Sequence, residues 1–421
     1  MVNPTGANGY DNGTVPPEDE LIAALQQYAR EELPLSRRLQ HLGAELGYHI
    51  KKAKLKKLNR KYNIPTSRKP PPLPLATTLI CEQMANDPHR HRGPTAVKSQ
   101  LALEGFNIPW AIVREVMHAN DDIGPTIRNP RSRSRHIVRV TLTSHGTWHE
   151  VSVDGHEKLS DKALQMGIVG FHIYGGRDKW SGKVLLLLVL PNSRFAEAIG
   201  HVYLDFVIEH EMIPIQVTFD GGSETADMKA IQTALRNTFA PDLDPSEWPP
   251  FMPIPSTRNI TIENLWSRWF THSGANLQKV LMEGKTNGLF NPGDNWLWSQ
   301  VTQQQLDAFK AYWNSHHVRT QRNKLMPSGS TPNDFFATPE QWGGRRDKNC
   351  GIPIDADVAE ALRAQINMRH EDAYKFVDDS FRQAAENAYE TIGSPALTVQ
   401  NGWEVFAQMK LVLHTVYASG M

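Results

Sequence analysis

The sequence predicts an α/β protein, a mixed sheet flanked by helices, with two small helical modules before it and a helical region after it. Three observations predict this class. Apolar residues recur at the helical period between residues 21 and 118, and strand-like runs alternate with amphipathic stretches between residues 149 and 239. The helical period then returns after residue 353. Hydrophobic residues make up 40% of the chain, which excludes a wholly disordered protein.

Length and cysteine content narrow the class of protein. A chain of 421 residues is expected to hold about two to four domains. The two cysteines, Cys81 and Cys350, cannot form a disulfide framework or a zinc site of several thiolates. The longest strongly apolar run covers residues 184–190, whereas a membrane span needs about 20 residues, and the first 20 residues show no signal-peptide pattern. We therefore expect no membrane partner and an intracellular location, the nucleus if the source is eukaryotic.

Charge is unevenly distributed along the chain. The 45 basic and 45 acidic residues cancel overall, but residues 21–140 hold 21 basic against 9 acidic side chains, and residues 141–421 hold 24 against 32. This asymmetry is typical of a basic nucleic-acid-binding front joined to a more acidic body, and DNA is the partner we expect. The alternative is a solvated charged face without a partner.

The front begins with a polar tail, residues 1–18, which we expect to be disordered. Residues 19–64 show three helical patterns, with a short turn containing Gly47 before the third. That order is typical of a helix-turn-helix module, whose last helix enters the major groove, although a structural three-helix bundle would show the same order. The third pattern is strongly basic and provides the candidate DNA-binding residues Lys51, Lys52, Lys54, Lys56, Lys57, Arg60 and Lys61.

Residues 65–75 form a proline-rich linker that we expect to be extended. A second helical module follows at residues 76–127, with helices expected at residues 76–84, 94–103 and 109–118. Residues 128–144 carry five arginines without apolar periodicity and are interpreted as a basic linker.

The α/β part is predicted from its order of elements. Strand-like runs cover residues 149–153, 168–174, 184–190 and 213–219, amphipathic stretches cover 194–211 and 224–239, and a late helix begins near Asn259. Three strands, a helix, a strand, a helix and a late helix are the order of the ribonuclease-H-like fold. We place this core at residues 145–340 and a helical region at 350–421.

Three acidic residues stand at the ends of these elements. Asp154 ends the first predicted strand, Asp220 ends the fourth, and Glu263 lies on the late helix. The first and fourth strands would be parallel neighbours, so their carboxyl ends would meet at one edge of the sheet. Acids from three elements can hold two divalent cations for phosphoryl transfer, and oxygen ligands favour Mg²⁺ or Mn²⁺. Each acid alone also fits an ordinary turn or a solvated helix.

Residues 145–340 resemble the retroviral-type integrase core, most closely that of fungal and animal transposable elements. The first block of that family, W-H-x-D-G-x-x-K-L, is matched with three extra residues after the histidine, and I-x-G-G-x-D-x-x-S is matched at residues 173–181. The block S-x-x-N-x-x-I-E-R-L-W is matched in register at residues 256–266, with Asn264 in place of arginine. A trailer W-N-x-H-x-x-R-T follows at residues 313–320.

The resemblance implies a DNA integrase or transposase with Asp154, Asp220 and Glu263 as the metal-binding catalytic triad. The implied reaction is attack on a DNA phosphodiester, first by water to free a 3′-hydroxyl and then by that hydroxyl on target DNA. Lys158, in the first block, is implied to contact DNA. Asn259 is interpreted as a helix N-cap or as a residue that orients DNA or Glu263. The family assembles as homo-multimers on paired DNA ends.

Several positions depart from the family. Thr261, Asn264 and Gly182 stand where arginine is usual, which would weaken phosphate contacts without changing the triad. Two alternatives to a full integrase therefore stay open. One is a DNA-binding protein that has lost cleavage, and the other is a nuclease that cuts without joining. The sequence does not identify the DNA ends recognised or the role of residues 350–421.

Other candidate groups are interpreted as structural. Cys81, His89 and His91 are close in sequence but too few for a zinc site. The histidines 316 and 317 are interpreted as surface or DNA-facing residues. The tryptophans are predicted to lie in the core rather than to stack on bases; they are Trp266, Trp269, Trp296, Trp298 and Trp313.

Overall fold

The computed structural model describes residues 13–121, 124, 143–156, 170–254, 259–289, 294–321, 325–342 and 349–419. The chain divides into two compact units. The first contains residues 1–141 and 314–346, and the second contains residues 142–313 and 347–421. The predicted core of residues 145–340 therefore contributes to both units. Most of the predicted polar tail and of the basic linker at 128–144 lies outside the described residues.

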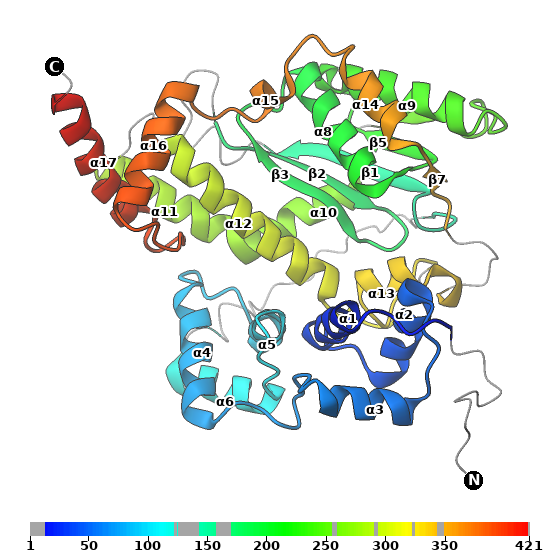
Figure 1. The fold of residues 1–421 in the computed structure, drawn as a ribbon, viewed down its shortest axis with the longest axis horizontal. Helices are drawn as coiled ribbons and strands as arrows, with labels where there is room; N and C mark the ends of the chain where they lie inside the picture. Colours follow the sequence, from blue (N-terminus) through cyan, green and yellow to red (C-terminus); the bar gives the residue numbers. More distant parts are fainter. Residues whose placement is uncertain are drawn as a thin grey trace, which may run out of the picture. The chain divides into compact units, whose positions relative to one another are not determined.

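The first unit opens with a three-helix bundle, α1 (Glu18–Arg30), α2 (Leu35–Leu46) and α3 (Lys52–Lys61), drawn in blue in Figure 1. The three predicted helices are confirmed. Leu25, Leu42 and Leu55 are fully buried, one from each helix, because each helix turns its apolar stripe inward. Helix α2 ends where Gly47 takes a left-handed conformation with φ of 58°, the backbone state that glycine adopts most readily.

A second bundle follows, made of α4 (Leu73–Ala85), α5 (Pro94–Leu103) and α6 (Trp110–Asn120). Its core holds Ile80, Leu101 and Val113, all fully buried. The expectation that residues 65–75 are entirely extended is wrong at its end, because α4 begins at Leu73. Pro74 is tolerated there since a proline in the first helical turn removes no intrahelical hydrogen bond.

The last part of the first unit comes from far along the chain. The short helix α13 (Pro332–Ala337) and the 3₁₀ turn η4 (Pro339–Gln341) pack in this unit with α2. Asp334 is fully buried and accepts hydrogen bonds from Arg37 Nε at 2.7 Å and His41 Nε2 at 2.9 Å. The end of the predicted core is thus held by the first helical bundle.

The second unit is built on a five-stranded mixed sheet (Figure 1). Strands β1 (Glu150–His156), β2 (His172–Asp178) and β3 (Val184–Leu190) form an antiparallel meander. Strands β5 (Gln216–Phe219) and β6 (Phe251–Pro253) continue the sheet parallel to β1, in the order β3-β2-β1-β5-β6. The predicted parallel pairing of the first and fourth strands is confirmed.

Three strand predictions need correction. Strand β2 lies at 172–178 instead of 168–174, because the pair Gly175-Gly176, which has the composition of a turn, is part of the strand. Strand β1 continues past Asp154 to His156. The predicted strand 213–219 is split at Pro214, which has no N–H to give to a ladder. Its first residues form β4 (Met212–Ile213), which pairs with β7 (Ile352–Pro353) in a separate small sheet.

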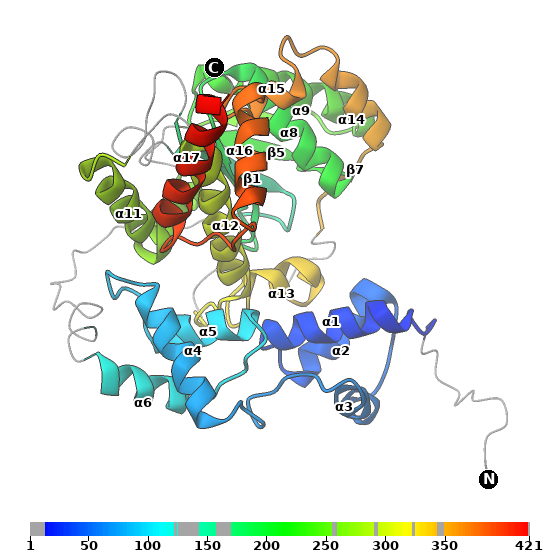
Figure 2. The same ribbon diagram turned by 60° about the vertical axis from the view of Figure 1, so that its left-hand side comes forward.

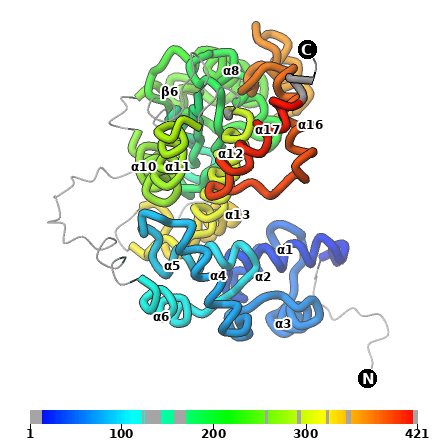
Figure 3. The backbone as a smooth tube through the Cα atoms, turned by 90° about the vertical axis from the view of Figure 1, so that its left-hand side faces the viewer, coloured from blue at the N-terminus to red at the C-terminus, as the bar shows by residue number. Residues whose placement is uncertain are grey.

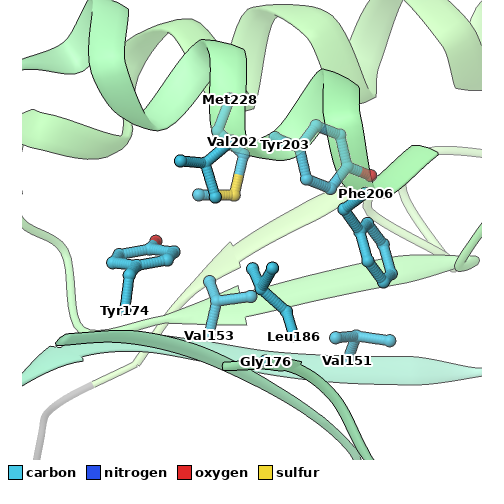
Figure 4. A pocket seen from close by; sticks show the side chains of 9 residues that line it. All are labelled: Val151, Val153, Tyr174, Gly176, Leu186, Val202, Tyr203, Phe206 and Met228. Atoms are coloured by element: carbon cyan, nitrogen blue, oxygen red, sulfur yellow. The ribbon is translucent and has the colours of Figure 1, made fainter. Parts of the chain in front are cut away.

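Helices cover both faces of the main sheet (Figures 1 and 2). One face packs against α8 (Ala196–His210) and against α9 (Ala226–Phe239), which follows the turn η1 (Ser223–Thr225). Figure 4 shows the space between them, an apolar cavity of about 10 Å³ between Val153, Leu186, Phe206 and Met228, which is the size of about one water molecule. Tyr174 also lines it and is buried with an unpartnered hydroxyl.

The other face packs against α10 (Ile260–Trp269) and the helices after it (Figure 3). These are the π-helical turn η3 (Phe270–Gly274), α11 (Ala275–Thr286) and α12 (Asp294–Ser315). The C-terminal helices α16 (Asp379–Thr391) and α17 (Gly402–Ser419) complete the same apolar cluster. The prediction that the tryptophans are core residues is confirmed for Trp266, Trp269, Trp298 and Trp313, and Trp296 is partly buried against the cluster.

Two further helices of the C-terminal region, α14 (Ala356–Arg363) and α15 (His370–Ala373), pack on α8. Their anchor is Asp205 of α8, which accepts hydrogen bonds from Arg363 at 2.8 Å and from His370 at 2.9 Å. Within the described ranges, no helix is both long and apolar enough to cross a bilayer.

Candidate active site

The three predicted acids come from three adjoining elements of the second unit. Asp154 lies in β1, Asp220 follows β5 directly, and Glu263 lies in the first turn of α10. Because β1 and β5 are parallel and α10 packs against β1, the three carboxyl groups belong to one edge of the sheet. Asp154 is half-buried, whereas Asp220 and Glu263 are exposed.

The electrostatics of Asp154 reflect its burial and its two acidic neighbours. Burial, together with the smaller effect of the nearby carboxylates of Asp220 and Glu263, raises the pKa of Asp154 from 3.8 to about 7. A hydrogen bond from Trp266 favours the charged form and opposes the rise. A carboxylate whose ionisation is disfavoured in this way is stabilised when a cation approaches.

Trp266 contacts Asp154 directly. Its indole Nε1 donates to Asp154 Oδ2 at 2.8 Å. Trp266 lies on α10, the helix that also carries Glu263. The indole lies over Gly175, the residue opposite Asp154 in the β1–β2 register. It also stacks on His156, with ring centroids 5.0 Å apart and planes 19° apart.

Asn259 ties α10 to β1 at the same place. It occupies the N-cap position, as predicted, but its side chain makes no capping hydrogen bond. Its amide instead donates to the backbone oxygen of Val153 at 3.3 Å, and the residue is only 2% exposed. The interpretation of Asn259 as a side-chain cap is therefore wrong, and its buried side chain is not presented to DNA. It fixes the start of α10 beside Asp154.

The chemistry of the three acids fits a hard divalent cation, because all their donor atoms are carboxylate oxygens. The raised pKa of Asp154 also fits, since a cation would offset the repulsion among the three charges. The side chains are not gathered into a finished ligand set, however. In the part of the chain that the structure describes, no three His, Cys, Asp or Glu residues are arranged to hold a metal ion.

The second matched block has a structural role. Asp178 is fully buried and accepts hydrogen bonds from the backbone N–H groups of Trp148 and Ser181, at 2.9 and 2.7 Å. Its pKa is raised by burial to about 6, against the opposing effect of these donors. Asp178 joins the β2–β3 turn to Trp148, two residues before β1, so it holds the sheet together and is not part of the group of Asp154, Asp220 and Glu263.

Gly182, where the resembled family has arginine, lies under a different arginine. The guanidinium of Arg177 donates from Nε to Gly182 O at 2.9 Å and from Nη1 to Thr261 O at 2.7 Å, and it lies over the Trp313 ring. A Cβ on Gly182 would come within 2.9 Å of Arg177 Nη2, and its φ of 76° disfavours other residues. This arginine joins the β2–β3 turn to α10 and is not available to phosphates.

The predicted DNA-binding residues of the first unit lie on one helix. Lys51 is the N-cap of α3, and the other six basic residues lie within the helix. All seven are exposed, while Leu55 and Leu58 turn inward. Lys61 is engaged by Glu18 at 2.6 Å. Lys158, the predicted DNA contact of the core, lies outside the described residues.

Sequence reasoning missed two features of these regions. One is the hydrogen bond from Trp266 to Asp154, whose partners are 112 residues apart. The other is the buried cluster of Asp334 with Arg37 and His41, for which the sequence carries no local signal.

The remaining histidines do not form a metal centre in the described chain. His89 and His91 stack on each other with centroids 5.6 Å apart, and His317 bonds to the backbone oxygen of Gly329. Neither a protein-family model nor any curated protein matches the chain.

Proposed function

We propose that the chain is a polynucleotidyl transferase of the integrase or transposase type. In this proposal Asp154, Asp220 and Glu263 hold two divalent cations, Mg²⁺ or Mn²⁺, at the edge of a ribonuclease-H-like sheet. The observation that carries it is the meeting of three carboxylates from β1, β5 and α10 at one edge, with the pKa of Asp154 raised to about 7.

The sheet supports the fold assignment. An antiparallel meander whose first strand is central, followed by strands parallel to it, is the topology expected of a ribonuclease-H-like core. Helices cover both faces, and the last acid lies on a helix that packs against the first strand. The element order that the sequence predicted is present, with the added edge strand β6.

The proposed reaction has two steps at phosphorus, a hydrolysis and then a transesterification. First, a water oxygen bonds to phosphorus and the bond to the 3′-oxygen breaks, which frees a 3′-hydroxyl. That hydroxyl then attacks a phosphodiester of target DNA and displaces the target 3′-oxygen. Bound divalent cations would supply activation of the attacking oxygen and neutralisation of the leaving one. The three carboxylates position those cations, and Asn259 keeps α10 against β1.

DNA binding is assigned to the first unit. Helix α3 presents Lys52, Lys54, Lys56, Lys57 and Arg60 to solvent, a density of positive charge that suits the phosphate backbone. Its position as the third helix of a bundle suits a helix-turn-helix module. The protein then acts as a homo-multimer on paired DNA ends, as the family resemblance implies.

A second candidate is a DNA-binding protein that has lost cleavage. It is favoured by Gly182, Thr261 and Asn264, none of which is the usual arginine. Helix α3 would serve this candidate equally well.

The test is nicking of supercoiled plasmid in Mn²⁺ by the wild type, Asp154→Asn and Glu263→Gln. Asp244→Asn, which changes an exposed aspartate outside the triad, is the matched control. We expect nicking by the wild type and the control and a loss of roughly a hundredfold or more in the two triad variants.

Equal nicking by all four proteins would overturn the site. Plasmid binding by all of them, without nicking by any, would support the DNA-binding candidate. If the wild type nicks, analysis of the products distinguishes a nuclease from an integrase, because only the latter gives joined DNA molecules.

A further inference from the structure

We infer that Trp266 is a positioning residue for Asp154. Its indole N–H holds one carboxylate oxygen, which leaves the remaining oxygen lone pairs of Asp154 for a divalent cation. The inference rests on the proposed function, because Trp266 has this role only if Asp154 is a metal ligand.

The hydrogen bond has the geometry of a specific contact. Nε1 lies 2.8 Å from Asp154 Oδ2, and Trp266 is 3% exposed, so water does not compete for the donor. An indole N–H is a donor only and carries no charge. It therefore orients the carboxylate without neutralising it, whereas a lysine or arginine in its place would compete with the cation.

Two contacts fix the indole ring in place. Gly175, opposite Asp154, provides space for the ring, since a Cβ there would lie 2.6 Å from Trp266 Cη2. His156 lies two residues after Asp154, on the same face of β1, and its ring stacks on the indole. A side chain held between these two neighbours keeps its N–H directed at Asp154, as an outer-shell partner of a metal ligand must.

Burial alone does not account for this hydrogen bond. Trp269 and Trp298 belong to the same core and are fully buried, yet their indole N–H groups have no hydrogen-bond partner. Trp313 does donate, but to the backbone oxygen of Gly182 at 2.9 Å. Among these tryptophans, Trp266 is the one that donates to an acidic side chain of the candidate triad.

Trp266→Phe tests the inference, with Trp313→Phe as its matched control. Phenylalanine keeps a ring beside Gly175 and His156 but removes the N–H. Each full-length protein is titrated with Mn²⁺, and free Mn²⁺ is measured by its electron paramagnetic resonance signal. We expect Trp266→Phe to bind Mn²⁺ about 10–100-fold more weakly than the wild type, and Trp313→Phe to bind as the wild type does.

Nicking kinetics give a second readout. The Mn²⁺ concentration at half-maximal rate is expected to rise in Trp266→Phe by the same factor as the dissociation constant, while the rate at saturating Mn²⁺ changes less. A purely structural role would lower the amount of folded protein, which a thermal melt detects, and would leave the Mn²⁺ affinity of the folded fraction unchanged.

Gly175→Ala keeps the test decisive if Trp266→Phe fails to fold. The added methyl group displaces the indole while its N–H remains, so a weaker Mn²⁺ affinity is again expected. Wild-type affinity in a folded Trp266→Phe or Gly175→Ala protein would overturn the inference. If the wild type binds Mn²⁺ no better than Asp154→Asn, the proposed function fails first and the inference fails with it.

Discussion

Asp334 in the first unit and Asp154 in the second are carboxylates withdrawn from water, but their surroundings are opposite. Asp334 is surrounded by donors. Arg37, His41 and Ser330 all bond to it, and although burial acts to raise its pKa, these partners lower the pKa overall. Asp154 has one side-chain donor, the neutral indole of Trp266, and two acidic neighbours, and its pKa rises to about 7.

The difference distinguishes a structural carboxylate from a candidate functional one. A fully satisfied buried charge fixes two segments together, and here Asp334 fixes α13 to α2. A buried charge left with repulsive neighbours is costly to the fold and is retained where a ligand will compensate it. By this criterion Asp154, with Asp220 and Glu263 near it, is a better candidate for an active site than Asp334.

The largest expected effect comes from Asp334→Asn. Removing this charge leaves the half-buried Arg37 without its carboxylate and leaves His41 with Glu45 as its one acidic partner, so the free energy of unfolding of the first unit should fall by about 3–5 kcal/mol. Urea denaturation measures this change. Glu18→Gln is the control, because it breaks an exposed ion pair with Lys61 and should change stability little. If the two substitutions lowered the free energy of unfolding equally, Asp334 would be no more important to stability than an exposed ion pair.

Asp154→Asn should behave in the opposite way. Its ionised form is disfavoured in the folded protein, so at pH 8 the free energy of unfolding should not fall, and a gain of on the order of 1 kcal/mol is expected. The Mn²⁺-dependent nicking rate should meanwhile drop roughly a hundredfold or more. A loss of stability as large as that of Asp334→Asn would mean that Asp154 is a structural residue.

The pH dependence of the first unit sharpens the comparison further. Burial acts to lower the pKa of His41, but its hydrogen bonds to the carboxylates of Asp334 and Glu45 outweigh this effect and raise the pKa from 6.5 to about 9. A raised histidine pKa gives stability that is complete below pH 6.5 and is lost as pH rises through 9. The expected loss is about 2–3 kcal/mol, followed by urea denaturation between pH 6 and 10.

His41→Gln is the control for this prediction, since it removes the titrating group and should flatten the alkaline loss. The lowered pKa of Asp334 gives a pH dependence of stability in the opposite direction. Its contribution is present above pH 3.8 and is lost as pH falls through the folded-state value. An alkaline loss that persists unchanged in His41→Gln would contradict the assignment.

The smallest effect is expected on α3, where the side chain of Lys57 is exposed. Lys57→Ala should reduce the slope of log affinity against log salt concentration by about 0.9 if Lys57 contacts one phosphate. Fluorescence anisotropy with labelled duplex DNA between 50 and 200 mM salt measures this slope. Lys98→Ala is the control, because Lys98 is paired with Glu32 in the same unit and should leave the slope unchanged.

Features that depend on residues close together in the sequence could be predicted, whereas contacts between distant residues could not. The helices of the first unit, the parallel neighbours β1 and β5, and the elements that carry Asp154, Asp220 and Glu263 follow from local periodicity and element order. The position of β2 does not follow from them, because Gly175-Gly176 has the composition of a turn, and the indole of Trp266 that fills the space beside Gly175 comes from a distant part of the chain. The sequence placed Trp266 in the core correctly, but its contact with Asp154 depends on tertiary packing.

The network of Asp334 was beyond prediction for the same reason. Neither Arg37 nor His41 shows in its own helix that it will be buried against an acid 297 or 293 residues away. In sequence both fit a solvated helix face. Asn259 is a milder case, since its N-cap position was predicted but the hydrogen bond to Val153 depends on how α10 meets the sheet.

The hydrogen bonds from Arg37 and His41 of α2 to Asp334 of α13 also have a consequence for the synthesis of the protein. Arg37 and Asp334 are separated by 297 residues, so at about 5–20 residues per second the ribosome completes Asp334 about 15–60 s after Arg37. The N-terminal bundle cannot reach its final stability until most of the polypeptide has been synthesised. A chain released early by a stalled ribosome would carry Arg37 and His41 without the carboxylate of Asp334, so its N-terminal bundle would lack this contribution to stability.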